Sequence, residues 1–182
     1  MSKEFNLDDS IRKIEDFPHK GILYFDITSI LTNPEAFSWC IDQMVEYYKD
    51  KKIDAVAAVE SRGFIFSAPF AKAMNIPLIL VRKAGKLPGV TLKKSYQLEY
   101  GKAEVEIHQS DVPQGKNVLL VDDLLATGGT MGAAVELLTM GGAKVNHIFG
   151  IIGLPFLKYA DKLPGIEIKT LIEYHSEKVD EQ

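Results

Sequence analysis

The amino-acid sequence predicts an α/β fold with a twisted, mainly parallel sheet flanked by helices and a small N-terminal hood. Short apolar runs alternate along the chain with segments whose apolar residues recur at helical spacing. The apolar runs are continuous, as expected for strands buried on both faces of a parallel sheet. With 182 residues, of which 46% are hydrophobic and 25% charged, the chain can bury one full core. We therefore expect one domain spanning residues 1–182.

The hood is expected from residues 1–33, which precede the regular alternation of strands and helices. The first helix then begins at Asn33-Pro34, because Asn is a favourable N-cap and Pro is tolerated in the first turn. Its apolar residues recur on one helical face. They are Phe37, Ile41, Met44, Val45 and Tyr48.

The remaining elements follow in order along the chain. We expect strands at residues 55–59, 78–81, 103–107, 118–121, 145–152 and 166–172, and helices at residues 62–74 and 131–140. Residues 85–101 are polar and lack a clear period, so we expect a mobile lid there. Ligands of such sheets bind at the carboxyl ends of the strands.

The most informative stretch is residues 118–130, Val-Leu-Leu-Val-Asp-Asp-Leu-Leu-Ala-Thr-Gly-Gly-Thr. Asp122 and Asp123 follow a buried strand and can accept hydrogen bonds from a vicinal diol. Residues 127–130 then offer hydroxyls and unobstructed backbone N–H groups at the start of a helix, where an anion is favoured. The two parts together fit a ribose 5-phosphate.

Two other interpretations of this stretch were weighed. A hydrophobic strand ending in two acids also occurs in P-loop ATPases, but the chain contains neither Gly-x-x-x-x-Gly-Lys-Ser/Thr nor Gly-x-Gly-x-x-Gly. A purely structural corner would not require two adjacent acids followed by hydroxyl and glycine residues. The sugar phosphate interpretation is therefore favoured.

Two further loops follow predicted strands at the same edge of the sheet. Residues 60–63, Glu-Ser-Arg-Gly, can receive a second anion. Arg82, Lys83 and Lys86 place three cations within five residues, which suits a polyanion. Either loop alone can be an ordinary solvated surface. Their positions after strands favour ligand binding.

Composition excludes several classes of protein. The net charge of −4 and the pI near 5.6 argue against binding of nucleic acid through bulk electrostatics. The single cysteine, Cys40, cannot form an internal disulfide and is expected in the core, which suits a reducing compartment. No signal peptide or membrane-spanning stretch is recognisable, so we expect a cytoplasmic protein without a membrane partner. The four histidines share no metal-ligand spacing.

Four motifs together resemble those of the type I phosphoribosyltransferases, and the resemblance covers nearly the whole chain. The motifs are residues 60–64 (Glu-Ser-Arg-Gly-Phe), 82–89 (Arg-Lys-Ala-Gly-Lys-Leu-Pro-Gly), 98–102 (Leu-Glu-Tyr-Gly-Lys) and 122–130. Within that family the chain is similar to the enzymes that act on adenine. Hypoxanthine and guanine enzymes usually have Asp where this chain has Ala126, and xanthine enzymes usually follow the Ala with Asn-Gly-Gln.

The resemblance implies a site for 5-phosphoribosyl pyrophosphate (PRPP). The implied PRPP-binding residues are Ser61, Arg62, Arg82, Lys83, Lys86, Tyr100, Asp122, Asp123, Ala126, Thr127, Gly128, Gly129 and Thr130. Glu99 is the candidate for assisting proton movement on the base, and Arg62 for stabilising the departing pyrophosphate. In the family, the residue that corresponds to Arg82 often reaches into the neighbouring subunit's site, which implies a homodimer. A cis peptide is also frequent in the loop at residues 60–63.

The hood segment, residues 17–27, resembles the base-binding strip of the family. The implied contacts are a stacking role for Tyr24 and backbone hydrogen bonds near Leu23 and Phe25. Many members have Arg at the position of Phe25. Because both aromatic residues are also good core residues, a core role for Tyr24 or Phe25 stays open.

The implied reaction is transfer of 5-phosphoribosyl from PRPP to adenine N9, giving AMP and pyrophosphate in purine salvage. Mg²⁺ is expected as cofactor, held mainly by substrate oxygens and water rather than by protein ligands. Two alternatives remain: transfer to xanthine or another 6-oxopurine, and a PRPP-sensing regulatory protein. The regulator is disfavoured by the acidic composition and by the lack of room for a winged helix before the hood.

Overall fold

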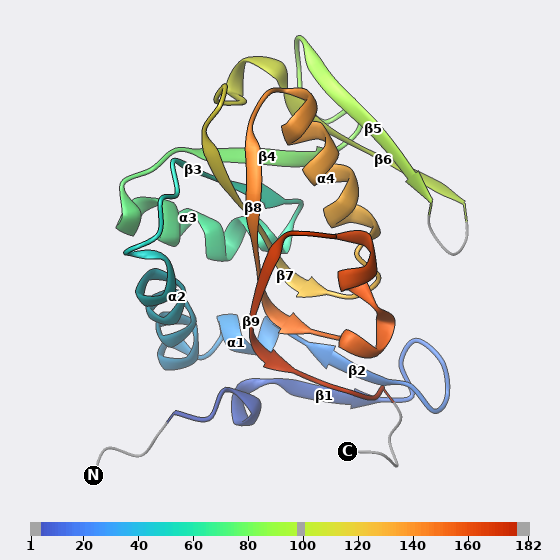
Figure 1. Ribbon diagram of the computed structural model, residues 1–182. Coiled ribbons are helices and arrows are strands. Elements are labelled where there is room, and N and C mark those ends of the chain that lie inside the picture. Colours follow the sequence, from blue (N-terminus) through green and yellow to red (C-terminus); the bar gives the residue numbers. More distant parts are fainter. Residues whose placement is uncertain (1–4, 98–100, 178–182) are drawn as a thin grey trace.

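The computed structural model describes residues 5–97 and 101–177, and Figure 1 shows their arrangement. A central sheet of seven strands has the order β5-β6-β4-β3-β7-β8-β9. The strands are β3 (Ala55–Val59), β4 (Leu78–Lys83), β5 (Thr91–Gln97), β6 (Lys102–His108), β7 (Asn117–Leu125), β8 (Lys144–Gly153) and β9 (Glu167–Glu173). The five adjacent strands β4, β3, β7, β8 and β9 pair in parallel. Strand β6 is antiparallel to β4 and to β5. The predicted α/β class with a mainly parallel sheet is confirmed.

Helices cover both faces of the sheet. They are α2 (Pro34–Tyr48), α3 (Arg62–Met74) and α4 (Gly129–Met140), with the short α1 (Thr28–Leu31). Strand residues alternate between the two faces. Val56 and Leu119 pack in a core cluster with α2 and α3, while Ala57 and Leu120 pack in a second cluster with α4. No helix among the described residues has the length and apolar character that crossing a bilayer requires.

Helix α2 begins where the sequence predicts. The Asn33 side chain accepts hydrogen bonds from the backbone N–H groups of Glu35 and Ala36, both at 3.2 Å, and Pro34 follows it. The predicted apolar face is inward. Ile41, Met44 and Tyr48 are buried, and Phe37 and Val45 are partly buried against the same cluster.

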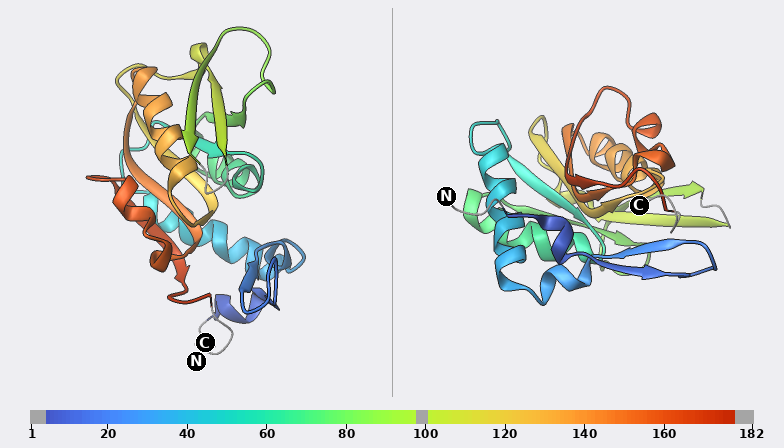
Figure 2. Two further views of the ribbon diagram at one scale, coloured as in Figure 1. Left: turned by 90° about the vertical axis from the view of Figure 1, so that its right-hand side faces the viewer. Right: turned by 90° about the horizontal axis from the view of Figure 1, so that it is seen from below.

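The hood has its own two-stranded antiparallel sheet of β1 (Arg12–Glu15) and β2 (Leu23–Asp26), preceded by the 3₁₀ turn η1 (Leu7–Ser10). The two strands form a ribbon at the opposite end of the molecule from β5 and β6 (Figure 1). Figure 2 shows the same ribbon projecting beside the lower end of the main sheet. Apolar hood residues such as Leu7 and Phe25 join the core cluster of α2, so the hood is packed against the sheet.

The structure corrects three predicted boundaries. The strand predicted at residues 78–81 extends to Lys83, so Arg82 and Lys83 lie within β4 instead of after it. The strand predicted at residues 118–121 extends to Leu125, so Asp122 and Asp123 lie within β7 instead of after it. The helix predicted from residue 131 begins at Gly129. Other predicted elements are confirmed, with β3 and α3 matching residue for residue.

The segment predicted as an irregular lid contains a regular strand. Residues Thr91–Gln97 form β5, which pairs along its whole length with β6. The prediction failed because the inward face of β5 carries only two apolar residues, Leu92 and Tyr96, with Lys94 between them, and both are only partly buried, so the hydrophobic alternation is weak. Whether this hairpin moves stays a prediction.

The 3₁₀ turns η2 (Gln109–Asp111), η3 (Pro155–Leu157) and η4 (Tyr159–Lys162) complete the described elements. Of these, η3 and η4 lie between β8 and β9 (Figure 1). The backbone at Tyr159, where η4 begins, approaches Gly128 closely. This connection therefore covers the loop that enters α4.

Candidate active site

The loop between β7 and α4 is the first part of the site. Gly128 has a φ of 74°, and a Cβ added there would lie 2.6 Å from the backbone oxygen of Tyr159. Only glycine fits both constraints. Among the described residues, no side-chain hydrogen bond caps α4, so its first N–H groups are free to bind an anion. The local geometry therefore supports the predicted phosphate loop.

Two pockets adjoin this loop. One, of about 130 Å³, is lined by Val59, Glu60, Val81, Arg82, Lys83, Tyr96, Val105, Asp122 and Thr130. The other, of about 390 Å³, lies between β5 and the start of α4 and includes Gly128, Gly129 and Lys162. Of the PRPP-binding residues that the sequence predicts, the two pockets bring together Arg82, Lys83, Asp122, Gly128, Gly129 and Thr130.

The adjacent acids of β7 have different surroundings, because neighbouring strand residues point to opposite faces. Asp122 lines the smaller pocket and accepts the backbone N–H of Asp123 at 2.8 Å. Burial and the negative charge of Asp123 raise the pKa of the Asp122 carboxyl well above its usual range. Asp123 is only 3% exposed and accepts a hydrogen bond from Arg62 Nε at 2.5 Å. Among the described residues, the carboxylate of Asp122 thus lacks the ion pair with an arginine that stabilises the carboxylate of Asp123.

The loop at residues 60–63 is held tightly against β7. The Glu60–Ser61 peptide bond is cis, and Ser61 is exposed. A Cβ added at Gly63 would lie 3.0 Å from the backbone oxygen of Val121, so α3 can approach the strand only with glycine there. This close approach brings Arg62, the first residue of α3, to Asp123.

The basic segment at residues 82–89, which begins at the end of β4 and is called the basic loop below, is anchored by Glu60. The Glu60 carboxylate accepts hydrogen bonds from Arg82 Nε and Nη2 at 3.1 and 3.4 Å, and from the backbone N–H of Lys83 at 3.0 Å. Burial opposes ionisation of Glu60, but the bonds from Arg82 and Lys83 outweigh it and lower its pKa. The side chains of Lys83 and Lys86 are exposed.

The β5–β6 hairpin reaches the phosphate loop through Tyr96. The Thr130 hydroxyl donates a hydrogen bond to the Tyr96 hydroxyl at 3.0 Å, and the Tyr96 ring lies 3.4 Å from a Cβ built at Gly129. The two predicted lid residues Glu99 and Tyr100 lie outside the described residues. Their roles stay predictions.

In the hood, the three predicted base-binding residues have different surroundings. Tyr24 makes an edge-to-face contact with Phe17 at 5.0 Å between ring centroids. Phe25 is 3% exposed and stacks on Tyr174 at 3.8 Å, which makes it a core side chain. Leu23 is also buried, and its backbone N–H donates to Glu177 O at 2.6 Å.

The outer edge of β2, away from β1, is partly occupied, because Leu23 donates its N–H there to Glu177 O. Strand alternation turns the backbone groups of Phe25 to the same outer edge. Any contact of Phe25 with a ligand is therefore made by its backbone. The predicted backbone contacts near positions 23 and 25 stay predictions, and at position 23 the N–H is already committed to Glu177.

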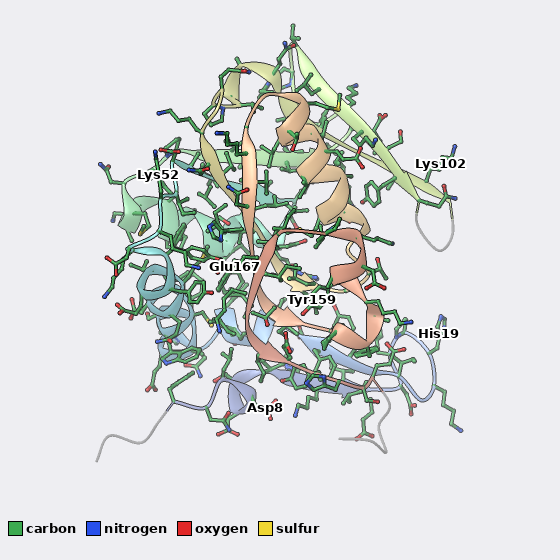
Figure 3. The ribbon with its side chains drawn as sticks, viewed as in Figure 1. Asp8, His19, Lys52, Lys102, Tyr159 and Glu167 are labelled. Atoms are coloured by element: carbon green, nitrogen blue, oxygen red, sulfur yellow. The ribbon has the colours of Figure 1, made fainter. Side chains whose placement is uncertain are left out.

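Metal ligands do not gather in the part of the chain that the structure describes, where no three His, Cys, Asp or Glu side chains could hold an ion together. The histidines are dispersed: His19 lies on the connection between β1 and β2 (Figure 3), and His147 is in β8 beside Glu167. Cys40 is buried, as predicted, and burial raises the pKa of its thiol to about 12.

Sequence reasoning missed several residues of the site. Glu60 and Tyr96 form hydrogen bonds with two predicted PRPP-binding residues, Arg82 and Thr130 respectively. Lys162 lines the pocket at Gly128, and Tyr174 packs against the hood. Glu60 has a local signal, because it directly precedes the anion loop at the end of a strand. The others have none, since each is brought to the site by long-range packing.

Comparison with known proteins identifies relatives of the whole chain. The sequence profile of the phosphoribosyl transferase domain matches residues 26–155. A curated adenine phosphoribosyltransferase from Treponema denticola is 61% identical over 98% of this chain and 94% of its own length. The crystal structure of adenine phosphoribosyltransferase from Thermoanaerobacter pseudethanolicus has a TM-score of 0.88 at 42% identity, covering 93% of this chain and all (100%) of that one.

A third relative was solved with ligands. It is adenine phosphoribosyltransferase from Saccharomyces cerevisiae, complexed with an imino-altritol bisphosphate and adenine. Its TM-score is 0.85 at 38% identity, over 91% of this chain and 96% of that one. The similarity thus extends over most of the chain.

Proposed function

The chain belongs to the adenine phosphoribosyltransferase family, and from this premise we propose how its residues carry out the reaction. It transfers the 5-phosphoribosyl group of PRPP to N9 of adenine, giving AMP and pyrophosphate in purine salvage. The observation that carries the assignment of roles is the pocket in which Asp122 and Thr130 of the β7–α4 region face Arg82 and Lys83.

PRPP is held at both of its anionic ends. The N–H groups and hydroxyls of residues 126–130 take the 5-phosphate at the N-terminus of α4. Ser61, Arg62, Arg82, Lys83 and Lys86 surround the pyrophosphate. Cations at that end lower the energy of the transition state, because negative charge builds on the leaving group.

Asp122 and Asp123 hold the ribose. As the bond from C1 of the ribose to the pyrophosphate oxygen breaks, positive charge develops on the ring, and the bond from C1 to adenine N9 forms. Asp122 accepts hydrogen bonds from ribose hydroxyls, which stabilise the ionised carboxylate that burial disfavours in the free protein. The N9 proton leaves with assistance from Glu99.

Adenine lies at the outer edge of β2. The backbone groups of Phe25 on that edge pair with the polar edge of the base, whereas the Leu23 N–H is held by Glu177 O, and Tyr24 packs against the adenine ring. The Phe25 side chain is buried against Tyr174. Phe25, which stands where many family members have Arg, therefore makes no side-chain contact with the base in this proposal.

Magnesium accompanies the pyrophosphate. The pocket offers hard oxygen donors that suit it, and of its carboxylates Glu60 is committed to Arg82 whereas Asp122 has no ion pair among the described residues. Asp122 is thus the protein group expected nearest to the ion, directly or through water. When bound, the ion neutralises charge on the pyrophosphate.

The protein works as a cytoplasmic homodimer in this proposal, and Arg82 either completes its own pocket, as its contacts within the chain favour, or reaches the neighbouring site, as the family resemblance implies. Leu80, two residues before Arg82 and therefore on the same face of β4, is 36% exposed, and Ile65 of α3 is 41% exposed. A mixing experiment tests the arrangement. Arg82→Ala and Asp122→Asn protomers, each inactive alone, regain activity when mixed only if Arg82 acts across the dimer; no recovery assigns Arg82 to its own subunit.

The assay that tests the function offers adenine, hypoxanthine, guanine and xanthine separately to the purified protein with PRPP and magnesium. We expect AMP from adenine and no nucleotide from the three oxopurines. Turnover of an oxopurine would reassign the base specificity. Binding of PRPP without turnover of any base would instead indicate a regulatory protein.

A further inference from the structure

A buried carboxylate outside the predicted site has an unusual set of partners. Glu106 lies in the middle of β6, between Val105 and Ile107, and is 1% exposed. Its strand neighbours are Arg82 of β4 on one side and Lys93 of β5 on the other. Since Val105 and Ile107 point into the core beside α4, Glu106 points to the opposite face of β6.

On that face the basic loop folds over the Glu106 side chain. Oε1 of Glu106 accepts the backbone N–H groups of Lys86 and Leu87, at 2.7 and 2.8 Å. Oε2 accepts the Thr91 hydroxyl at 3.3 Å and lies 3.6 Å from Lys93 Nζ. Burial opposes ionisation, but these four donors outweigh it and lower the pKa of Glu106.

The bonds continue from Glu106 to the pyrophosphate end of the pocket. The backbone oxygen of Lys86 accepts a long hydrogen bond of 3.4 Å from Arg82 Nη1. The same guanidinium is bound by Glu60, which directly precedes Ser61 and Arg62. Glu60 and Glu106 therefore hold the basic loop from two sides.

We propose that Glu106 is a positioning residue for the pyrophosphate site: it fixes the backbone at Lys86 and Leu87 so that Lys86 and Arg82 are presented together to the leaving group. The loop stays in this place because moving it would leave a buried carboxylate without its backbone donors. The negative charge also offsets the mutual repulsion of Arg82, Lys83 and Lys86 before the ligand arrives.

The inference rests on the proposed function, and the adenine site gives it an internal reference. Base contacts are predicted in the hood, at the other end of the molecule from the start of β5, which the basic loop precedes (Figure 1). Loss of positioning at Lys86 therefore changes affinity for PRPP and pyrophosphate and leaves the adenine KM unchanged. A merely structural role for Glu106 would lower the melting temperature without that selectivity.

The test compares Glu106→Ala and Glu106→Gln with Glu104→Gln. Glu104 is the matched control, because it lies two residues away on the same face of β6, is exposed, and its side chain accepts a hydrogen bond from Ser95. We measure the KM values for PRPP and adenine in the forward reaction, the KM for pyrophosphate in the reverse reaction, and the Kd for pyrophosphate with magnesium by calorimetry.

We expect Glu106→Ala to raise the KM for PRPP and for pyrophosphate by about tenfold or more, as loss of charge-assisted hydrogen bonds does, with the adenine KM unchanged. Glu106→Gln gives a smaller increase, because its amide oxygen can still accept the N–H groups of Lys86 and Leu87. Glu104→Gln matches the wild type.

If Glu106→Ala does not fold, Glu106→Gln decides the question. Unchanged pyrophosphate affinity in every folded Glu106 variant overturns the inference, as does an equal loss of affinity for adenine and PRPP. A wild-type protein that forms no nucleotide overturns the proposed function instead. The calorimetric comparison still tests Glu106 in that case, because it requires no turnover.

Discussion

The phosphate end and the base end of the predicted site are built in different ways. At the phosphate end, Asp122, Gly128 and Thr130 come from one short stretch in which β7 passes through a tight loop into α4. At the base end, β2 is supported by Tyr174 and Glu177 from beyond the last strand. The phosphate end is thus local in the sequence, whereas the base end joins the two terminal regions of the chain.

The hood contacts form one connected set. Tyr174 stacks on Phe25, donates its hydroxyl to Asp8 Oδ1 at 2.5 Å, and carries Lys13 Nζ at 5.3 Å from its ring centroid. Asp8 lies at the base of the hood (Figure 3). Substitutions at the phosphate end should therefore change the KM for PRPP, whereas substitutions around Tyr174 should change the KM for adenine.

The largest effect is expected for Asp122→Asn at the phosphate end. Loss of the carboxylate that we propose holds the ribose should lower kcat/KM by about a hundredfold or more. Steady-state kinetics measure this. The matched change Asp54→Asn, in a carboxylate that accepts the Asn117 backbone N–H away from both pockets, should leave kinetics unchanged. Wild-type turnover in Asp122→Asn would remove this residue from the site.

The same variant should be more stable than the wild type when no ligand is present. Because the folded state raises the pKa of Asp122, it disfavours the ionised form, and this cost grows as the pH rises above the ordinary value of 3.8. Asn carries no such charge, so Tm at pH 7 should rise, by about 2–4 °C if the gain is about 1 kcal/mol. The advantage should shrink toward pH 4. A lower Tm at pH 7 would contradict it.

Gly128→Ala should have the next largest effect. The added Cβ meets the Tyr159 backbone at 2.6 Å in a left-handed conformation, so the loop must shift. We expect the KM for PRPP to rise by about tenfold or more while the adenine KM stays unchanged. Gly132→Ala, within α4, is the control, because its Cβ meets only the Lys162 backbone oxygen, at 3.6 Å. Equal effects of the two substitutions would argue against a special loop geometry.

At the base end, Tyr174→Ala should raise the adenine KM by about fivefold to tenfold and leave the KM for PRPP unchanged. The substitution removes the ring on which Phe25 stacks and frees the edge of β2 from its support. Tyr174→Phe keeps the stack and should lie close to the wild type in both constants. A parallel rise in both KM values would show that hood and phosphate loop are not independent.

The smallest effect is expected for Asp8→Asn. The side-chain bonds from Tyr174 and Lys13 outweigh burial and lower the pKa of Asp8, so its ionised form stabilises the folded state above pH 3.8 and this contribution is lost as the pH falls through the lowered value. Thermal melts should show a deficit of about 1–2 °C at pH 7, since the pair is partly exposed. The deficit should shrink as the pH falls below 3.8 and vanish once the pH is below the lowered pKa; a constant deficit would rule out the ionic origin.

Much of the fold could be read from the sequence because its signals are local. Asn33-Pro34 marks the start of α2, and continuous apolar runs mark β3, β7 and β8. Strand β5 was missed for the opposite reason. It is held by antiparallel pairing with β6 and by contact with α4, and its own hydrophobic alternation is limited to Leu92 and Tyr96.

The sequence by itself determined the α/β class and the corner from β7 into α4, because a strand, a two-glycine turn and a helix start are specified by neighbouring residues. Only the tertiary structure decided which charged and aromatic groups meet. Arg62 and Asp123 are 61 positions apart, and Glu106 reaches Lys86 across 20. Such pairs depend on which strands lie side by side and in what register, and that arrangement follows from burying the two faces of the whole sheet.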